Sequence, residues 1–179
     1  GVQSWGFRAK EDYYTTEHLI RSIDRYLARG ANYLLNAGPT AEGIVPPESD
    51  QILRRIGSWF DKAQESFFVT YPVPNFTTNS DVLVTRREST FYIHLCKKPI
   101  SSAVQLKPLK VLPRSATLLN NGAPVECVVD MLPIDHVSQE TFLRLRNLPV
   151  EEFDDEVLVV KLEFDDNFHE SILENLTIP

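Results

Sequence analysis

The residues best placed to do chemistry lie in one loop, residues 36–47, which follows the short apolar run Tyr-Leu-Leu at 33–35. That run is too short for a buried helix and predicts a fully buried strand. Glu42 then stands beyond the carboxyl end of the strand, where barrel enzymes carry their catalytic groups. Because a carboxylate between Ala41 and Gly43 is typical of a solvated turn, we interpret Glu42 as a surface residue without a catalytic role.

Asn36 is the second polar candidate, because it ends the predicted strand. Its side-chain amide could reach the floor of a pocket, or it could orient the Gly38-Pro39 turn through the hydrogen bonds that asparagine makes in turns. Pro46 and Pro47 favour a helix start, because a first turn does not need the missing N–H. The loop is therefore predicted to join a buried strand to a helix.

Two amphipathic helices are predicted on either side of this strand and loop. The first starts at Thr15 or Thr16 and runs to about Arg29, and the second runs from about Glu48 to Lys62. Each carries an apolar stripe at helical spacing, formed by Leu19, Ile20, Ile23, Tyr26 and Leu27 in the first and by Ile52, Leu53, Ile56 and Phe60 in the second. The order helix, strand, loop, helix is one βα step of an α/β fold.

Beyond residue 70 the apolar residues alternate, which predicts strands instead of helices. The predicted strands are 82–85, 90–96, 103–106, 116–119, 126–129, 142–145 and 157–164. Asn120-Asn121-Gly122 is typical of a hairpin turn. Short strands separated by turn signals indicate an antiparallel β-sandwich. We therefore divide the chain into residues 1–70, an extended linker at 71–78 and a sandwich at 79–179.

Composition narrows the classes of partner. The chain has 18 Lys and Arg against 25 Asp and Glu, a formal charge of −7, and no basic cluster interleaved with aromatic residues. Nucleic acids and anionic membranes are therefore not expected as partners. No run of about 18 apolar residues occurs, so no membrane span is expected.

No metal site or cofactor is expected either. The four histidines are His18, His94, His136 and His169. None of them has a second histidine or a cysteine at the spacing that metal ligands need. The acidic run 151–156 lacks the glycine-punctuated spacing of a calcium loop, and we interpret it as a solvated hairpin loop.

The cysteines and two possible glycosylation tripeptides have simple structural explanations. Cys96 and Cys127 lie in apolar runs without a CxxC spacing, which favours buried free thiols. Asn75-Phe76-Thr77 and Asn175-Leu176-Thr177 fit the tripeptide that accepts N-linked glycans, but this tripeptide is common by chance.

Several motifs in a fixed order carry a resemblance to a known family. They are Ser4-Trp5-Gly6-Phe7, Leu19-Ile20, the stretch 32–47, Ile56-Gly57-Ser58-Trp59-Phe60, the hairpin at 118–122 and Arg146-Asn147-Leu148-Pro149. In these the sequence resembles the α-L-fucosidases of glycoside hydrolase family 29. Gly30-Ala31-Asn32 and Ala63-Gln64-Glu65-Ser66 depart from the family pattern, so a related sugar could replace fucose.

The resemblance implies an α+β fragment of a larger enzyme. Residues 1–70 would supply the final βα step of a (β/α)8 TIM-like barrel, and residues 79–179 the C-terminal antiparallel β-sandwich. The whole enzyme would be a retaining glycosidase that removes terminal α-L-fucose from glycoconjugates. Its nucleophile and its acid/base would lie upstream, so this chain is expected to contain no catalytic residue and to be inactive alone. Its expected partners are a fucosylated glycan and the N-terminal barrel portion of the same enzyme.

Two residues are the candidates for substrate binding. The resemblance places an aromatic side chain of the Ser-Trp-Gly motif beside the bound sugar, which implies this role for Trp5. Aromatic rings pack well on the C–H faces of sugars, although a tryptophan that fills the barrel rim is equally compatible with the motif. Asn36, at the end of the last predicted strand, is the second candidate.

The sandwich leaves an alternative from a different class, a non-catalytic carbohydrate-binding module. Phe91 and Tyr92 are adjacent in one predicted strand, so at most one of them can face outward. A sugar-binding platform usually needs several aromatic residues on one face, so a purely structural role for the sandwich is favoured.

Overall fold

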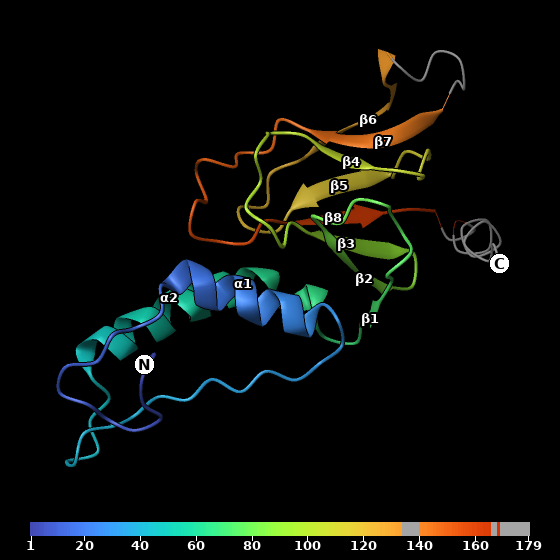
Figure 1. Ribbon diagram of the computed structural model, residues 1–179. Helices are drawn as coiled ribbons and strands as arrows, with labels where there is room; N and C mark the ends of the chain where they lie inside the picture. The colour runs from blue at the N-terminus through green and yellow to red at the C-terminus, as the bar shows by residue number, and fades with distance from the viewer. Residues whose placement is uncertain (134–139, 166–167, 169–179) are drawn as a thin grey trace.

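The computed structural model describes residues 1–133, 140–165 and 168. Among these residues, two helices and a short 3₁₀ turn precede eight strands (Figure 1). They are α1 (Thr16–Leu27), α2 (Pro47–Ala63), η1 (Gln64–Ser66), β1 (Tyr71–Pro72), β2 (Leu83–Arg87), β3 (Thr90–His94), β4 (Val104–Leu106), β5 (Ser115–Leu118), β6 (Glu126–Met131), β7 (Thr141–Arg146) and β8 (Val159–Glu163). Both predicted helices and the predicted strands from residue 82 onward are found, with ends that shift by a few residues.

The strands form two antiparallel sheets, as the alternating pattern predicts. One sheet has the order β1-β2-β3-β8-β5 and the other the order β4-β7-β6. The main hydrophobic core lies between them and includes Phe91, Ile93, Leu106, Leu143 and Leu162. At the predicted hairpin the Leu118 N–H donates to the Ala123 carbonyl oxygen and Gly122 has a φ of 73°, but the flanking strands β5 and β6 lie in different sheets and form no hairpin ladder.

The two helices cover the opposite face of the five-stranded sheet, so the molecule has three layers (Figure 1). Thr15 caps α1 by accepting a hydrogen bond from the His18 N–H. Apolar side chains of both helices then pack against the sheet in a second cluster, with Leu19, Ile20, Ile23, Ile56 and Trp59 on the helices and Tyr92, Val157 and Val159 on the strand side. The boundary between residues 1–70 and 79–179 stays a prediction, because this cluster joins the two segments.

Phe91 and Tyr92 point to opposite faces of β3, as their adjacency in one strand predicts, and both faces are covered. Phe91 and Tyr92 are 2% and 0% exposed, so neither faces solvent. Phe91 points into the core between the sheets, whereas Tyr92 lies under the helices. Residues 71–78, the predicted linker, begin with β1, which pairs with β2 at the edge of the five-stranded sheet.

The predicted buried strand at 33–35 is also not found. Residues 32–39 form an extended segment outside both sheets (Figure 1). Leu34 in this segment is 93% exposed. A strand needs neighbours that accept and donate its backbone hydrogen bonds, and the described residues offer none here. The two helices are therefore present as predicted, but the segment between them is not a paired strand.

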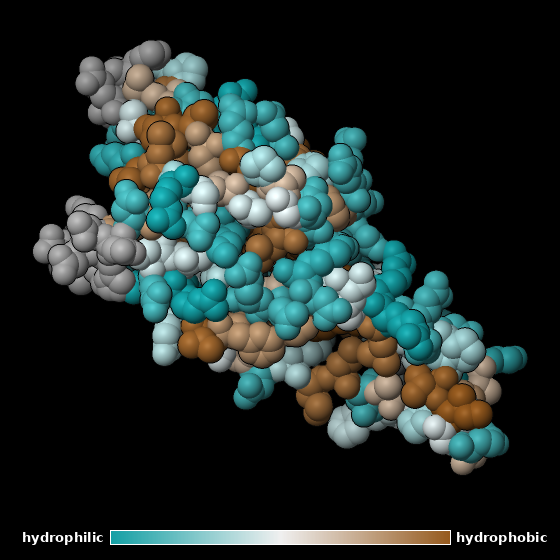
Figure 2. Space-filling view, turned by 180° about the vertical axis from the view of Figure 1, so that it is seen from behind, coloured by the Kyte–Doolittle hydropathy of each residue, from teal (hydrophilic) through white to brown (hydrophobic). Residues whose placement is uncertain are grey.

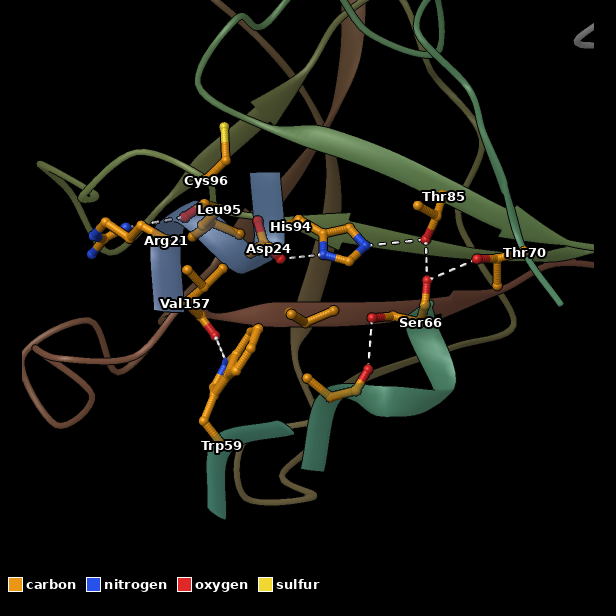
Figure 3. Close-up of polar contacts among 12 residues, drawn as sticks. Arg21, Asp24, Trp59, Ser66, Thr70, Thr85, His94, Leu95, Cys96 and Val157 are labelled. Atoms are coloured by element: carbon orange, nitrogen blue, oxygen red, sulfur yellow. Dashed lines mark hydrogen bonds and ion pairs between the residues drawn. The ribbon is translucent and has the colours of Figure 1, made fainter. Parts of the chain in front are cut away.

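A buried polar network ties the helix layer to the sheet (Figure 3). Asp24 of α1 and His94 of β3 are both fully buried, with Oδ1 and Nδ1 2.7 Å apart. His94 Nε2 lies 3.0 Å from Thr85 Oγ1, which donates its only proton to the Ser66 carbonyl oxygen. The two ring nitrogens of His94 therefore connect α1 with β2 and η1 through buried hydrogen bonds.

The second attachment of the helices runs along α2. Trp59 is fully buried, and its indole Nε1 donates to the Val157 carbonyl oxygen at 3.0 Å. Lys62 Nζ lies 2.8 Å from Glu156 Oε1, and Arg55 pairs with Asp155. The prediction of a solvated acidic loop at 151–156 is therefore wrong in part, because its carboxylates meet cations that lie far away in sequence.

The two cysteines are free, as predicted. Cys96 is buried and Cys127 is half-buried. Burial raises the pKa of both thiols, to about 11 for Cys127, so both are poor nucleophiles at neutral pH.

We expect Asp24→Ala to lower the free energy of unfolding by about 1–3 kcal/mol, because it leaves the buried Nδ1 of His94 without its hydrogen-bond partner. Urea denaturation followed by circular dichroism measures this. Glu17→Ala is the control, since it removes the more exposed i,i+4 partner of Arg21 and should cost at most about 0.5 kcal/mol. Equal losses in the two variants would contradict a special role for the buried pair.

Val69 generates a second prediction. It follows η1 with a φ of 57°, which is strained for a β-branched residue, and its side chain is 77% exposed. Val69→Gly should therefore raise the free energy of unfolding by about 1 kcal/mol, since glycine accepts this backbone at little cost. Val69→Ala keeps a Cβ at the same φ and should change stability far less. Thermal unfolding compares the two variants, and a destabilised glycine variant would refute the strain argument.

Candidate functional site

A hollow of about 220 Å³ lies where the N-terminal loop, the segment 33–37 and the first turns of both helices meet. Both predicted substrate-binding residues line it. Its full lining is Gly1, Ser4, Trp5, Tyr13, Tyr14, Leu19, Tyr33, Leu34, Leu35, Asn36, Ala37, Ser49, Ile52 and Leu53. Aromatic and aliphatic side chains dominate, with a few hydroxyl groups and one amide, which is the usual make-up of a small-molecule site.

Trp5 and Asn36 are brought into contact although 31 positions separate them in sequence. The Asn36 side-chain amide donates a hydrogen bond to the backbone carbonyl oxygen of Trp5. Asn36 therefore holds the backbone that carries the indole. The sequence left two roles open for this amide, reaching the pocket floor and orienting the Gly38-Pro39 turn. The hydrogen bond supports an orienting role, but the segment that it orients is residue 5 and not the turn.

Gly38 makes this contact possible. A Cβ at this position would lie 2.4 Å from the carbonyl carbon of Gly6 and 2.5 Å from the amide nitrogen of Phe7. Real Cβ atoms do not approach backbone so closely, so any side chain here would push the two segments apart. The segments 5–7 and 36–38 are thus fastened by one hydrogen bond and one glycine.

The apolar surface of this region faces solvent. Trp5 is 91% exposed, and Leu34 and Ile44 are 93% and 63% exposed. Figure 2 shows apolar surface at the end of the molecule that carries the N-terminal loops, at the lower right. An exposed indole offers a flat apolar face of the kind that packs against sugar C–H groups.

Sequence reasoning missed the tyrosines around the hollow. Tyr13 and Tyr14 precede α1 and Tyr33 follows it. Tyr14 stacks on His18 with ring centroids 5.0 Å apart, so it is held by α1. Their clustering was not visible in the sequence, although the aromatic pair before a helix cap was a possible signal.

The structure agrees with the interpretation of Glu42 as a solvated turn residue. Gly43 has a φ of 80° in a tight turn, where the Thr40 N–H donates to the Ile44 carbonyl oxygen at 2.8 Å. Glu42 is exposed, and a hydrogen bond from the Thr40 side chain lowers the pKa of its carboxyl group. A general acid needs a raised pKa, so Glu42 is unsuited to protonate a leaving group.

Within the described ranges, no three His, Cys, Asp or Glu side chains gather closely enough to hold a metal ion. No helix in that part of the chain is long and apolar enough to cross a membrane. The described residues beyond Thr78 include no exposed aromatic side chain, so the described part of the sandwich presents no aromatic platform for a sugar.

We expect Asn36→Ala to loosen the segment 4–7, because it removes the hydrogen bond to Trp5. One such bond contributes about 1 kcal/mol, which corresponds to roughly a fivefold increase in local opening. Backbone ¹⁵N relaxation of Gly6 and Phe7 measures the change. Asn32→Ala is the matched control, since no hydrogen bond joins its side chain to any described residue. An unchanged Gly6 amide would overturn the orienting role.

Comparisons with known proteins agree on one family. A family model described as "Alpha-L-fucosidase" matches residues 1–65. The plasma alpha-L-fucosidase of Rattus norvegicus is 32% identical over 131 residues, which are 68% of this chain and 28% of that protein. The plasma alpha-L-fucosidase of Homo sapiens is 30% identical over 134 residues, which are 70% of this chain and 29% of that protein. The chain thus spans less than a third of the length of these relatives.

Solved structures support the same assignment. Alpha-L-fucosidase isoenzyme 1 from Paenibacillus thiaminolyticus superposes with a TM-score of 0.72 at 26% identity, covering 90% of this chain and 38% of that one. The alpha-L-fucosidase from Vibrio sp. strain EJY3 has the same fold, with a TM-score of 0.71 at 24% identity over 88% of this chain and 27% of that one. The resemblance inferred from the motifs is confirmed, and the chain belongs to the α-L-fucosidase family.

Proposed function

We propose that the chain is the C-terminal portion of a retaining α-L-fucosidase-like glycoside hydrolase that removes terminal α-L-fucose from glycoconjugates. The observation that carries this proposal is the hollow at Trp5 and Asn36. It is built by residues 1–53, which fall within the 1–65 region that matches the fucosidase family model. The relatives' greater length leaves room for a catalytic portion before residue 1.

The segment 32–39 would close the barrel of the complete enzyme. Its backbone is extended and lies outside both sheets, and Leu34 exposes nearly all of its side chain. A barrel strand that lacks its neighbouring strands would be an extended apolar segment with free backbone N–H and C=O groups. The N-terminal barrel portion is therefore the partner that we propose for this surface.

Trp5 would form one wall of the sugar pocket. Asn36 holds the backbone of Trp5 and the indole itself is exposed, so the ring is available for contact with the C–H face or the methyl group of fucose. The close approach at Gly38 sets the distance between the segment 5–7, which carries Trp5, and the segment 36–38. Trp5 is thus a binding residue, and Asn36 and Gly38 are positioning residues.

The chemistry would be done by carboxyl groups outside this chain. Retaining hydrolysis needs two of them about 5–5.5 Å apart, one as nucleophile and one as acid and then base. Glu42, the carboxylate nearest to the predicted strand end, is exposed and has a lowered pKa. The sandwich would brace the barrel through the Asp24–His94 pair and the Trp59 contact.

The test uses the longer enzyme that contains these residues. Trp5→Ala should lower kcat/KM for an aryl α-L-fucoside by about 10- to 100-fold, mainly through KM, since a lost aromatic contact is worth about 1–3 kcal/mol. Phe7→Ala is the matched control, because Phe7 lies in the same loop but not in the lining of the hollow. Circular dichroism establishes that both variants fold.

Two outcomes would overturn the proposed function. The longer enzyme could fail to turn over the fucoside, or residues 1–179 alone could turn it over after stringent purification. A Trp5→Ala variant with unchanged KM would remove Trp5 from the pocket while leaving the assignment of the activity in place.

A further inference from the structure

The turn between β1 and β2 carries the tripeptide Asn75-Phe76-Thr77, whose pattern alone is common by chance. The structure adds three observations about it. Asn75 is exposed, at a tight turn in which the Phe76 N–H donates to the Val73 carbonyl oxygen at 3.3 Å. An acceptor asparagine has to be presented in such an exposed turn or loop.

The second observation is that the Asn75 amide has no structural task. Five of the seven described asparagines use their side chains in hydrogen bonds, namely Asn36, Asn79, Asn120, Asn121 and Asn147. The Asn75 side chain makes no hydrogen bond to any described residue. Substitution on its nitrogen would therefore break no contact within the described part of the fold.

The third observation concerns the two residues that follow. Phe76 is 2% exposed and stacks on Phe91, with ring centroids 4.6 Å apart. Thr77 Oγ1 accepts a hydrogen bond from the Asn79 N–H at 3.1 Å. Because the turn is pinned immediately after Asn75, the asparagine stays at the surface and its substituent would extend into solvent.

We propose that Asn75 is an acceptor site for an N-linked glycan when the chain is made in the secretory pathway. The donor is a lipid-linked oligosaccharide diphosphate. The Asn75 Nδ2 forms a bond to the anomeric carbon of the first N-acetylglucosamine, the bond from that carbon to the diphosphate oxygen breaks, and Nδ2 loses one proton. The lipid diphosphate leaves, and no oxidation or reduction takes place.

A glycan at this position would lie beside the edge of the five-stranded sheet. Asn75 stands three residues after β1, the outer strand, in which Tyr71 is 73% exposed. Open sheet edges invite pairing with other chains, and a bulky hydrophilic group blocks that approach. A glycan on Asn75 would therefore protect this sheet edge from pairing with another chain.

The test is expression of the chain, with a secretion signal and an affinity tag, in cultured animal cells. Total protein is purified from lysate and medium and digested with trypsin, which releases residues 63–86 as one peptide with a single acceptor tripeptide. We expect this peptide to carry a hexosamine-containing glycan. Treatment with peptide N-glycosidase should remove the glycan and convert Asn75 to aspartate. The second tripeptide, at 175–177, falls on another peptide.

Matched variants make the result specific. Asn75→Gln and Thr77→Ala should abolish the modification, whereas Thr77→Ser keeps the hydroxyl and should preserve it. Thr78→Ala changes the neighbouring threonine and leaves the tripeptide intact, so it should have no effect. An unmodified peptide 63–86 in cells that glycosylate a co-expressed secreted protein would overturn the proposal, as would a glycan that persists in Thr77→Ala.

Discussion

The structure depends on burying both faces of one antiparallel sheet. Phe91 and Ile93 of β3 face the three-stranded sheet, whereas Tyr92 and His94 face the helices. Antiparallel sheets commonly leave one face to water, but here β3 and β8 have apolar or paired residues on both. The helices are thus held by the same strands that make the sandwich core, and the two hydrophobic clusters share one sheet.

Burial on two faces also explains the polar interactions between layers. Asp24 and His94 are fully enclosed, and Asp24 Oδ2 has no hydrogen-bond partner within the described structure. A hydrophobic pair at these positions would not carry that desolvation cost. The pair instead fixes the position of α1 on the sheet, because the carboxyl group and the imidazole must meet with a defined hydrogen-bond geometry. Apolar side chains would allow the helix to shift along the sheet. Thr85 and Ser66 extend this fixed geometry to the start of the sandwich.

Local pattern was sufficient to predict the helices and strands, because periodicity and the Thr15 cap are properties of short segments. The family resemblance selected Trp5 and the predicted strand end selected Asn36, although their contact was not foreseen. What the sequence failed to predict, or left open, concerns partners that are distant along the chain. Whether 33–35 pairs, whether Tyr92 is covered and whether Asp155 meets Arg55 depend on segments up to 100 residues away. The strain at Val69 was invisible as well, because a valine gives no sign of a positive φ.

The two tryptophans give the chain a pair of independent optical probes. Trp59 is fully buried and bonded to a carbonyl group, so its emission should lie at short wavelength and resist quenching by small solutes. Trp5 is 91% exposed, so its emission should resemble that of indole in water. One spectrum therefore reports separately on the attachment of the helices to the sheet and on the covering of the hollow. Addition of a barrel partner should shift the second component and leave the first in place.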